Sequence, residues 1–237
     1  MRSFIKLNNK MSETNNYIAI ILARGGSKGI KFKNLFKINN KPLIYWSIRD
    51  CLRSKKISSV WVSSDNLRIL KYVKKFGARP ILRPKKYAGD NSSSESAWLH
   101  AVNFLEAKNI AISNIVGIQP TSPLRNKKDL DNACKIFSKN KFDSLFSALS
   151  ITDHFIWSKK KGKLFSNYNF RNRPRRQKIK EKYLENGSFY IFNKKKFLIH
   201  KNRLFEKIGV YSMSKINSFQ IDDMDDVKIV NSLKKYF

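Results

Sequence analysis

The sequence predicts an α/β fold of three layers, in which helices cover both faces of a mostly parallel sheet. Two observations support this prediction. Between residues 17 and 151, short apolar runs that suit buried strands alternate with longer segments of helical periodicity. Uninterrupted apolar runs are typical of parallel strands that are covered on both faces. Alternation of this kind requires right-handed crossovers between the strands of one sheet.

The elements of the first 84 residues follow from their own side chains. YIAIILA, residues 17–23, is continuously apolar and is therefore the first strand. The helix predicted at 43–52 follows Pro42, a residue that a first helical turn tolerates. The next helix, LRILKYVKKFGA, ends at Gly77, since glycine is common just after a last helical turn. Two strands complete this part, SSVWVSSD and RPILRP.

The alternation continues beyond residue 90. Helices are predicted at 92–107 and 128–139, with the strands NIVGIQP and DSLFSALS after them. Residues 151–182 are basic and loop-rich, without a long periodic run, and are predicted to leave the sheet as an excursion. NGSFYIF then returns as a strand. The tail from Asp222 is predicted to be a helix whose acidic residues lie at its N-terminus, where the helix dipole favours them.

Length and composition fit one folded domain in the cytoplasm. The chain has 237 residues, of which 41% are hydrophobic, enough for a core of its own. Residues 1–16 are a polar N-terminal extension, and 17–237 form the domain. The first apolar run is too short for a signal peptide core or a membrane span, so no membrane partner is expected. Cys51 and Cys134 lack metal-ligand spacing and are expected to be reduced core thiols.

The charge balance raises the possibility of a polyanionic partner. The chain has 49 Lys and Arg against 17 Asp and Glu, a formal net charge of +32. Such a surface attracts nucleic acid, anionic lipid or phosphorylated small molecules. The basic residues are spread over the whole length, which favours a solvated basic surface over a dedicated nucleic-acid face. Nucleic-acid binding is kept as an alternative from another functional class.

A glycine-rich loop follows the first strand and reads ARGGSKGIKFKN. Glycine lets backbone N–H groups converge on an anion, because no side chain blocks the approach. Arg24, Lys28 and Lys33 add positive charge to the loop. Its spacing matches neither GxxxxGK[ST] nor GxGxxG. The loop predicts a phosphate site whose charge suits a nucleoside triphosphate, the alternative being a plain turn with solvated cations.

Polar segments follow several of the predicted strands. In an open parallel sheet, ligands bind outside the carboxyl ends of the strands. The segments expected there are rich in donors for phosphates and hydroxyls: ARGGSKG, SSD ending at Asp65, RP ending at Pro84, QPTSPLR, and NRPRRQ and ENG from the excursion.

The order of these motifs resembles that of one enzyme family. LARGGSKGIKFKN, KPLIYWSI, VSSD, LRP, DNSSSES and QPTSPLR follow one another as in the acylneuraminate cytidylyltransferases, also called CMP-sialic acid synthetases. The resemblance extends from about Ile18 to the C-terminal helix. It implies a Rossmann-like nucleotidyltransferase fold of the nucleotide-diphospho-sugar transferase type. Residues 17–237 would then be the cytidylyltransferase domain, with 151–182 as a dimerisation insertion that reaches the partner's site.

The resemblance also implies a reaction. The family joins CTP to a nine-carbon α-keto acid sugar and releases pyrophosphate, with Mg²⁺ as the usual metal and a homodimer as the active form. Catalysis in that case is mainly positioning and neutralisation of charge on the triphosphate. No nucleic-acid partner is expected. Relatives that activate legionaminic, pseudaminic or Kdo-type acids keep the identity of the sugar open.

Matching motifs assign the nucleotide site. Arg24 and Lys33 are expected to be catalytic and to lie nearest the reacting phosphate. The segment DNSSS departs from the commoner DTASS, so that Asn91 takes the place of threonine, and helix capping is the alternative role for it. The expected nucleotide-binding residues are Arg24, Gly25, Ser27, Lys28, Lys33, Asn34, Arg83, Asn91 and Ser94.

The sugar site is assigned in the same way. The sugar carboxylate needs a fixed cation, and Arg175 is the residue expected to supply it, with Arg173 and Arg176 as neighbours. A solvated basic loop is the alternative for this segment. The expected sugar-binding residues are Gln119, Ser122, Arg175, Gln177, Asn186 and Tyr190.

The metal site shows the largest departure from the family. Bacterial relatives have an IDID-like segment with two aspartate ligands, whereas this chain has Gln220 first and Asp222 second. Asp222 is the expected Mg²⁺ ligand, since phosphates and water can complete the octahedron. Asp223 and Asp226 are expected to be helix N-terminal charges. A catalytically weakened homologue remains an alternative because of Gln220.

Overall fold

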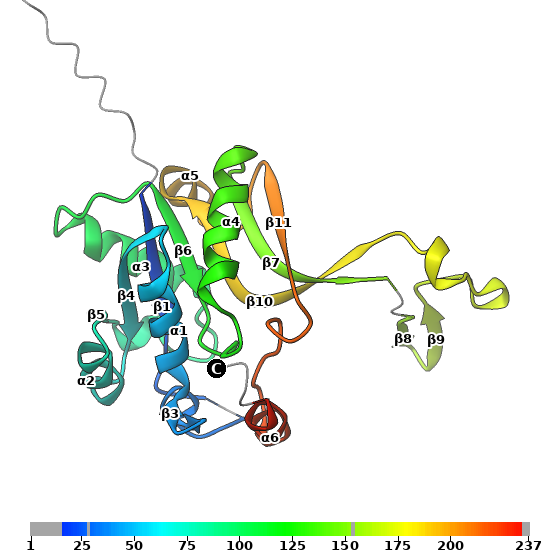
Figure 1. Ribbon diagram of the computed structural model, residues 1–237, viewed down its shortest axis with the longest axis horizontal. Coiled ribbons are helices and arrows are strands. Elements are labelled where there is room, and N and C mark those ends of the chain that lie inside the picture. Colours follow the sequence, from blue (N-terminus) through cyan, green and yellow to red (C-terminus); the bar gives the residue numbers. More distant parts are fainter. Residues whose placement is uncertain (1–15, 28, 153–154, 234–237) are drawn as a thin grey trace, which may run out of the picture.

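The computed structural model describes residues 16–27, 29–152 and 155–233. Its centre is a seven-stranded sheet of order β11-β7-β10-β6-β1-β4-β5 (Figure 1). Neighbouring strands pair in parallel except β10, which is antiparallel to both β6 and β7. The strands of this sheet are β1 (Tyr17–Leu22), β4 (Ile57–Ser64), β5 (Arg79–Leu82), β6 (Asn114–Ile118), β7 (Ser144–Ile151), β10 (Lys182–Asn193) and β11 (Ile208–Met213).

Helices cover both faces of the sheet. Side chains of α1 (Leu43–Arg53), α2 (Leu67–Lys75) and α4 (Lys127–Lys139) pack in one core cluster, and those of α3 (Ser94–Glu106) and α5 (Lys194–His200) pack in the other. A third cluster joins α6 (Met224–Ser232) to the small hairpin of β2 (Lys37–Ile38) and β3 (Lys41–Pro42). The predicted three-layer α/β fold is therefore confirmed.

Strand β1 shows how the sequence produces these layers. Ala19 and Ile21 are fully buried on one face, whereas Ile18 and Ile20 are buried in the cluster on the opposite face. Successive side chains of a strand point to opposite faces, so a strand covered on both sides must be apolar throughout. The continuous run YIAIILA meets this requirement.

The structure departs from the prediction at β10 and at several unpredicted elements, two of which belong to the central fold. The strand returning at NGSFYIF is antiparallel, because β7 runs outward into the excursion and β10 comes back beside it without a crossover helix. The edge strand β11 and the seven-residue helix α5 were not predicted. Both elements are short, and several side chains of β11 are partly exposed, so neither segment shows a distinct hydrophobic periodicity in the sequence.

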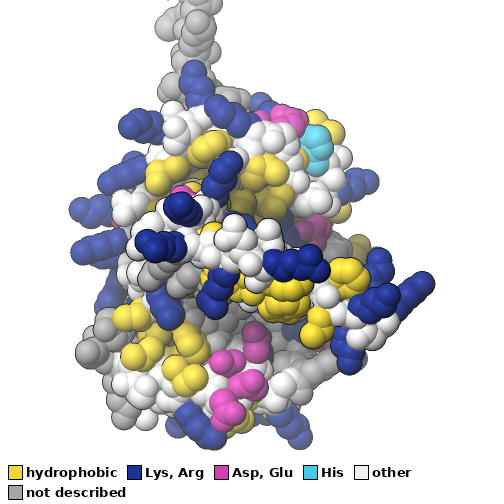
Figure 2. All heavy atoms as spheres, turned by 90° about the vertical axis from the view of Figure 1, so that its right-hand side faces the viewer, with side chains coloured by type: hydrophobic (Ala, Val, Ile, Leu, Met, Phe, Trp, Pro, Cys, Tyr) yellow, Lys and Arg dark blue, Asp and Glu magenta, His cyan; other side chains and the backbone are white. Residues whose placement is uncertain are grey.

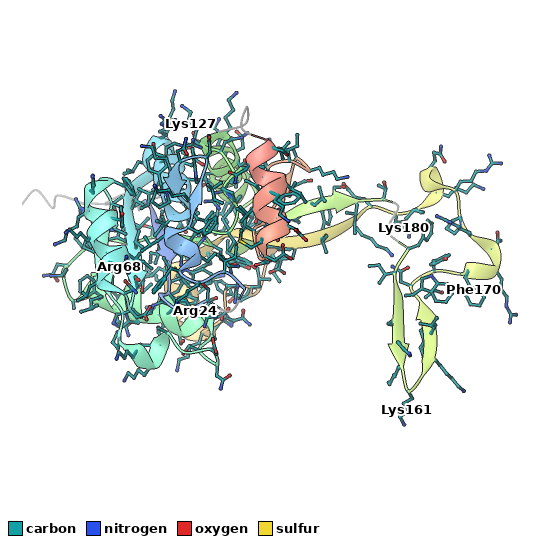
Figure 3. The ribbon with its side chains drawn as sticks, turned by 90° about the horizontal axis from the view of Figure 1, so that it is seen from below. Arg24, Arg68, Lys127, Lys161, Phe170 and Lys180 are labelled. Carbon is teal, nitrogen blue, oxygen red and sulfur yellow. The ribbon has the colours of Figure 1, made fainter. Side chains whose placement is uncertain are left out.

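Between β7 and β10 the chain leaves the sheet, as predicted. The described part of this excursion, residues 155–181, is called the arm below. It contains the hairpin of β8 (Trp157–Lys160) and β9 (Lys163–Ser166) and projects far from the body (Figures 1 and 3). The ring centroids of Phe155 and Tyr168 are 4.4 Å apart, so these two rings pack together. Trp157 is 44% exposed and Phe165 is 52% exposed.

The remaining structural expectations concern thiols and membranes. Cys51 and Cys134 are free and buried, as predicted, and burial raises the pKa of the Cys51 thiol to about 12. Within the described ranges, no helix is long and apolar enough to cross a lipid bilayer.

Candidate active site

The glycine-rich loop lies between the end of β4 and the segment before α6. The Gly25 backbone N–H donates to Asp65 Oδ1 at 2.8 Å, and a Cβ at Gly25 would lie 2.8 Å from the Asn66 side chain. Gly29 is even closer to its neighbour, because a Cβ there would lie 2.4 Å from the backbone oxygen of Asp222. The loop therefore needs glycine at both points to fit between these segments.

The two cations predicted to be catalytic each face a carboxylate. Arg24 Nη1 lies 2.9 Å from Asp90 Oδ1, and Lys33 Nζ lies 3.0 Å from Asp222 Oδ1. The Asn34 amide donates to the Arg24 carbonyl oxygen at 2.9 Å and so ties the two halves of the loop together. The geometry brings two positive charges to one end of the sheet, each held by an acidic neighbour.

Both pairs line a pocket of about 580 Å³, called the first pocket below. The elements that form it are the glycine-rich loop, the segment between β5 and α3, and the turn after β6. This is the carboxyl end of the parallel strands, where the polar segments after the strands predicted a ligand site. The predicted residues that line it are Arg24, Ser27, Lys33, Asn34, Arg83, Ser94, Gln119 and Asp222.

Arg83 lies at the back of the first pocket and is only 5% exposed. Its guanidinium donates to the Ser63 carbonyl at 3.1 Å and to the Tyr87 carbonyl at 3.4 Å. Burial lowers the pKa of this guanidinium, and the nearby Asp65 carboxylate opposes that shift. Arg83 therefore fixes the segment that leads to Tyr87, which also lines the pocket.

A second pocket of about 650 Å³ adjoins the first, and both are lined by Gln119 and Asp222. Asn186 and Tyr190, two predicted sugar-binding residues, also line the second pocket. Asn186 Oδ1 accepts from Ser147 Oγ at 2.7 Å, which holds its side chain in place. Two adjoining pockets with shared residues can hold two substrates whose reacting atoms meet between them.

The wall of the second pocket combines residues of the predicted ENGSFY segment with Lys215, which the sequence had not indicated. The Tyr190 hydroxyl donates to Glu185, and burial raises the pKa of that hydroxyl. Lys215, from the segment after β11, lines the same pocket and provides a cation. Gly187 has a φ of +61°, and a Cβ there would lie 3.2 Å from Gln220 Nε2 and 3.4 Å from Gln119 Oε1. Glycine is required at this turn because it combines a left-handed backbone with close neighbours.

Arg125, the last residue of QPTSPLR, is a further residue that sequence reasoning missed. It is fully buried, and its guanidinium donates to the Ser188 carbonyl at 2.9 Å and to Ser47 Oγ at 2.7 Å. It also reaches the Gln119 carbonyl at 3.4 Å, and burial lowers its pKa. Arg125 thus joins the turn after β6 to β10 beneath both pockets. Its position in the motif QPTSPLR could have indicated a role at the site.

Several predicted residues do not line the two pockets. Gly25 lines neither pocket, and its backbone N–H donates to Asp65. Ser122 is only 1% exposed and also lines neither pocket. Asn91 is exposed beside the first pocket, and the N-cap of α3 is Ser93, so the capping alternative for Asn91 was wrong. Arg175 and Gln177 are exposed on the arm, and Lys28 lies outside the described residues.

The residues around Asp222 fit a magnesium ion that phosphates and water help to coordinate. The Asp222 side chain is 72% exposed and lines both pockets, and Gln220 lines the second pocket. No cluster of three or more His, Cys, Asp or Glu in the described ranges could hold a metal alone. Mg²⁺ commonly binds through one or two carboxylates together with substrate phosphates, so this sparse set is compatible with it.

The neighbouring acids cap α6, as predicted. Asp223 Oδ1 accepts from the backbone N–H groups of Asp225 and Asp226, and Asp226 Oδ2 accepts from the backbone N–H of Asp223 at 3.2 Å. This reciprocal capping box occupies both side chains. Figure 2 shows acidic side chains gathered low on the face that carries the arm, within a surface dominated by Lys and Arg.

These features define a class of protein. A mostly parallel sheet with a glycine-rich cationic loop at the carboxyl end of its parallel strands and two adjoining pockets has the architecture of a nucleotidyltransferase. A solved structure with this fold is CMP:2-keto-3-deoxy-manno-octonic acid synthetase complexed with CTP, which has a TM-score of 0.68 and 15% identity, and the match covers 93% of this chain and 98% of that one. Residues 18–235 match the family model described as cytidylyltransferase, and the chain belongs to that family.

The similar curated relatives include enzymes named for two different sugars. N-acylneuraminate cytidylyltransferase of Oncorhynchus mykiss is 38% identical over 77% of this chain and 42% of its own length. N-acylneuraminate cytidylyltransferase A of Danio rerio is 37% identical over 91% of this chain and 50% of its own length. The chain thus spans about half the length of these fish relatives. Pseudaminic acid cytidylyltransferase of Campylobacter jejuni is 29% identical over 92% of this chain and 96% of its own length.

Proposed function

We propose that this chain transfers CMP from CTP to the anomeric hydroxyl of a sialic acid, an N-acylneuraminate, and releases pyrophosphate. The product would be the CMP-sugar donor for surface glycans. The observation that carries the proposal is the pair of adjoining pockets that share Gln119 and Asp222. CTP would occupy the first pocket and the sugar the second, so that the attacking hydroxyl meets the α-phosphate where the pockets join.

The chain's own residues would work through charge and position. Arg24 and Lys33 would leave their carboxylate partners to contact the triphosphate, and Gln119 would orient the sugar at the junction. Fixed cations stabilise charge that develops on phosphate oxygens in the transition state. Mg²⁺, when bound with CTP at Asp222, would supply further charge neutralisation. We further infer a cytoplasmic location.

Pseudaminic acid is the second candidate for the sugar. The Campylobacter jejuni relative with that printed activity is similar over nearly its whole length, whereas the fish relatives are similar over about half of theirs. Legionaminic and Kdo-type acids are further alternatives. The side chains of the second pocket would select among these sugars, because in this proposal only the sugar occupies that pocket.

The test is pyrophosphate release from CTP and Mg²⁺ with N-acetylneuraminic, legionaminic, pseudaminic and Kdo acids in turn. We expect release with CTP and N-acetylneuraminic acid, no release with ATP, GTP or UTP, and loss of release in excess EDTA. Release with pseudaminic acid instead would change the sugar and keep the reaction. An absence of CTP binding would refute the proposal and favour the nucleic-acid alternative. CTP binding without turnover on any sugar would indicate a weakened metal site at Gln220.

We also infer that the active form is a homodimer in which the arm of one subunit reaches the sugar of the other. The arm projects away from the body that carries its own pockets, as the labels of Lys161 and Phe170 against Arg24 show (Figure 3). It exposes Trp157 and Phe165, which are large apolar side chains suited to a protein contact. Its basic residue Arg175 would then meet the sugar carboxylate of the partner's site.

Arg175→Ala is therefore expected to raise the KM for the sugar about ten- to a hundredfold, the effect of losing a charge-assisted hydrogen bond. The KM for CTP should change little. Steady-state kinetics with each substrate varied in turn measures both constants, and sedimentation of the wild type tests the dimer. Lys159→Ala, which removes another exposed cation of the arm, is the matched control. A larger change in the KM for CTP would contradict the assignment.

A further inference from the structure

Asp90 is an acidic side chain in a pocket that is built for an anion. We propose that Asp90 is an internal competitor of the triphosphate for Arg24, and that it sets the affinity of the enzyme for CTP and pyrophosphate. This inference rests on the proposed function, because it concerns the same pocket. Nothing in the charge-neutralising role of Arg24 requires a carboxylate beside it, so the role of Asp90 needs an explanation of its own.

The contact between the two residues is direct. Arg24 Nη1 donates to Asp90 Oδ1 at 2.9 Å and reaches the Gly89 carbonyl at 3.3 Å. The two acceptors are consecutive in the chain and bind the same nitrogen. Arg24 and Asp90 both line the first pocket, together with Gly89. The guanidinium predicted to contact phosphate is thus already held by a negative side chain within that pocket.

The segment that carries Asp90 is fixed independently of Arg24. The Ser92 backbone N–H donates to the Gly89 carbonyl at 3.1 Å, and Ser92 Oγ donates to the Lys86 carbonyl at 3.1 Å. These bonds form a turn between the short 3-10 helix η2 (Lys85–Tyr87) and α3. Asp90 is therefore presented to Arg24 from a turn that has hydrogen bonds of its own.

The exposure of the pair favours exchange with a ligand. The Arg24 side chain is 35% exposed and that of Asp90 is 56% exposed. Ion pairs that are accessible to water are weak, so a phosphate with more charge can displace the carboxylate. The lost pair nevertheless reduces the net affinity for the ligand. For a pair with this exposure, the reduction is about two- to fivefold.

A competitor of this kind acts only on ligands that carry the phosphates. CTP and pyrophosphate bind more weakly because of Asp90, whereas cytidine, which has no phosphate, binds equally with or without it. After transfer, the return of Arg24 to Asp90 assists the departure of pyrophosphate. Asp90 therefore raises the KM for CTP and keeps product inhibition low.

Asp90→Asn tests this role by isothermal titration calorimetry of CTP, pyrophosphate and cytidine in the presence of Mg²⁺ and about 0.1 M salt, where exposed charges remain partly screened. Asparagine keeps the size of the side chain and removes its charge. We expect CTP and pyrophosphate to bind about two- to fivefold more tightly than to the wild type, with cytidine unchanged. Pyrophosphate should also become a stronger product inhibitor. Asp90→Glu, which restores the charge, should return affinity toward the wild-type value.

Asp225→Asn is the matched control, because it removes the same charge from another exposed pair. Asp225 lies 2.8 Å from Lys228 on α6 and lines neither pocket. It should leave CTP affinity unchanged, which separates the local pair from the net charge. Equal or weaker CTP binding by a folded Asp90→Asn protein would overturn the inference and make Asp90 a support for Arg24. If the wild type does not bind CTP, the proposed function fails as well, so the two failures are distinguishable.

Discussion

Arg24→Ala is expected to lower kcat/KM for CTP by at least about a hundred- to a thousandfold, the loss seen when a fixed donor to developing charge is removed. Arg24 lies at the carboxyl end of β1 and lines the first pocket, where, among the described residues, both Arg24 and Lys33 face exposed carboxylates. Its removal leaves the triphosphate with one positive charge fewer, because only Lys33 and Mg²⁺ would then oppose the charge that develops. The measurement is steady-state pyrophosphate release, with circular dichroism to confirm the fold.

The control for this substitution is Arg53→Ala. Arg53 is exposed in the last turn of α1 and lines neither pocket, so its loss should leave kcat/KM within about twofold, as is usual for surface positions. Near-normal turnover by Arg24→Ala would remove the glycine-rich loop from the mechanism. A loss in both variants would instead point to the overall positive field of the protein.

Gly29→Ala is expected to reduce activity about a hundredfold, because a misplacement of about 1 Å at a reacting group has an effect of that size. The added Cβ would lie 2.4 Å from the backbone oxygen of Asp222, so the loop or the segment before α6 must shift. That shift displaces Asp222, the proposed Mg²⁺ ligand, relative to Lys33 and the first pocket; the two side chains are 3.0 Å apart. The same overpacking should lower the free energy of unfolding by about 1–3 kcal/mol.

Gly26→Ala is the comparison for stability. A Cβ at Gly26 would meet no atom of the described residues within 4 Å, so this variant should keep the melting temperature of the wild type while Gly29→Ala lowers it. Thermal unfolding of both variants provides the measurement. Equal melting temperatures, with turnover retained in Gly29→Ala, would show that the approach of the loop to Asp222 is dispensable.

The fold was largely predictable because its central strands are buried on both faces. YIAIILA is apolar at every position, and residues such as Ile18 and Ala19 contribute to opposite clusters. The observed bounds of helix α4, Lys127–Lys139, also agree closely with the predicted helix at 128–139. Edge strand β11 and helix α5 were missed, since a short element with few buried side chains has no clear period.

Much of the candidate site was predictable because its residues belong to local motifs. The glycine-rich loop supplied Arg24, Ser27 and Lys33, and all three line the first pocket. The contributions of Asp90 and Arg125 could not be assigned in this way. Asp90 pairs with Arg24, which is 66 positions away in the sequence, and Arg125 donates to Ser188, which is 63 positions away. Such pairings depend on how strands are ordered in the sheet.

The sequence by itself determined the α/β class, the cationic loop at the end of β1 and the presence of an excursion after β7, because each depends on neighbouring residues. Only the tertiary structure decided that Lys33 faces Asp222, which is 189 positions away, and that two pockets meet at Gln119. It also decided the antiparallel direction of β10. The physical reason is that strand order and loop closure bring distant segments together, and local propensity does not encode which distant segments those are.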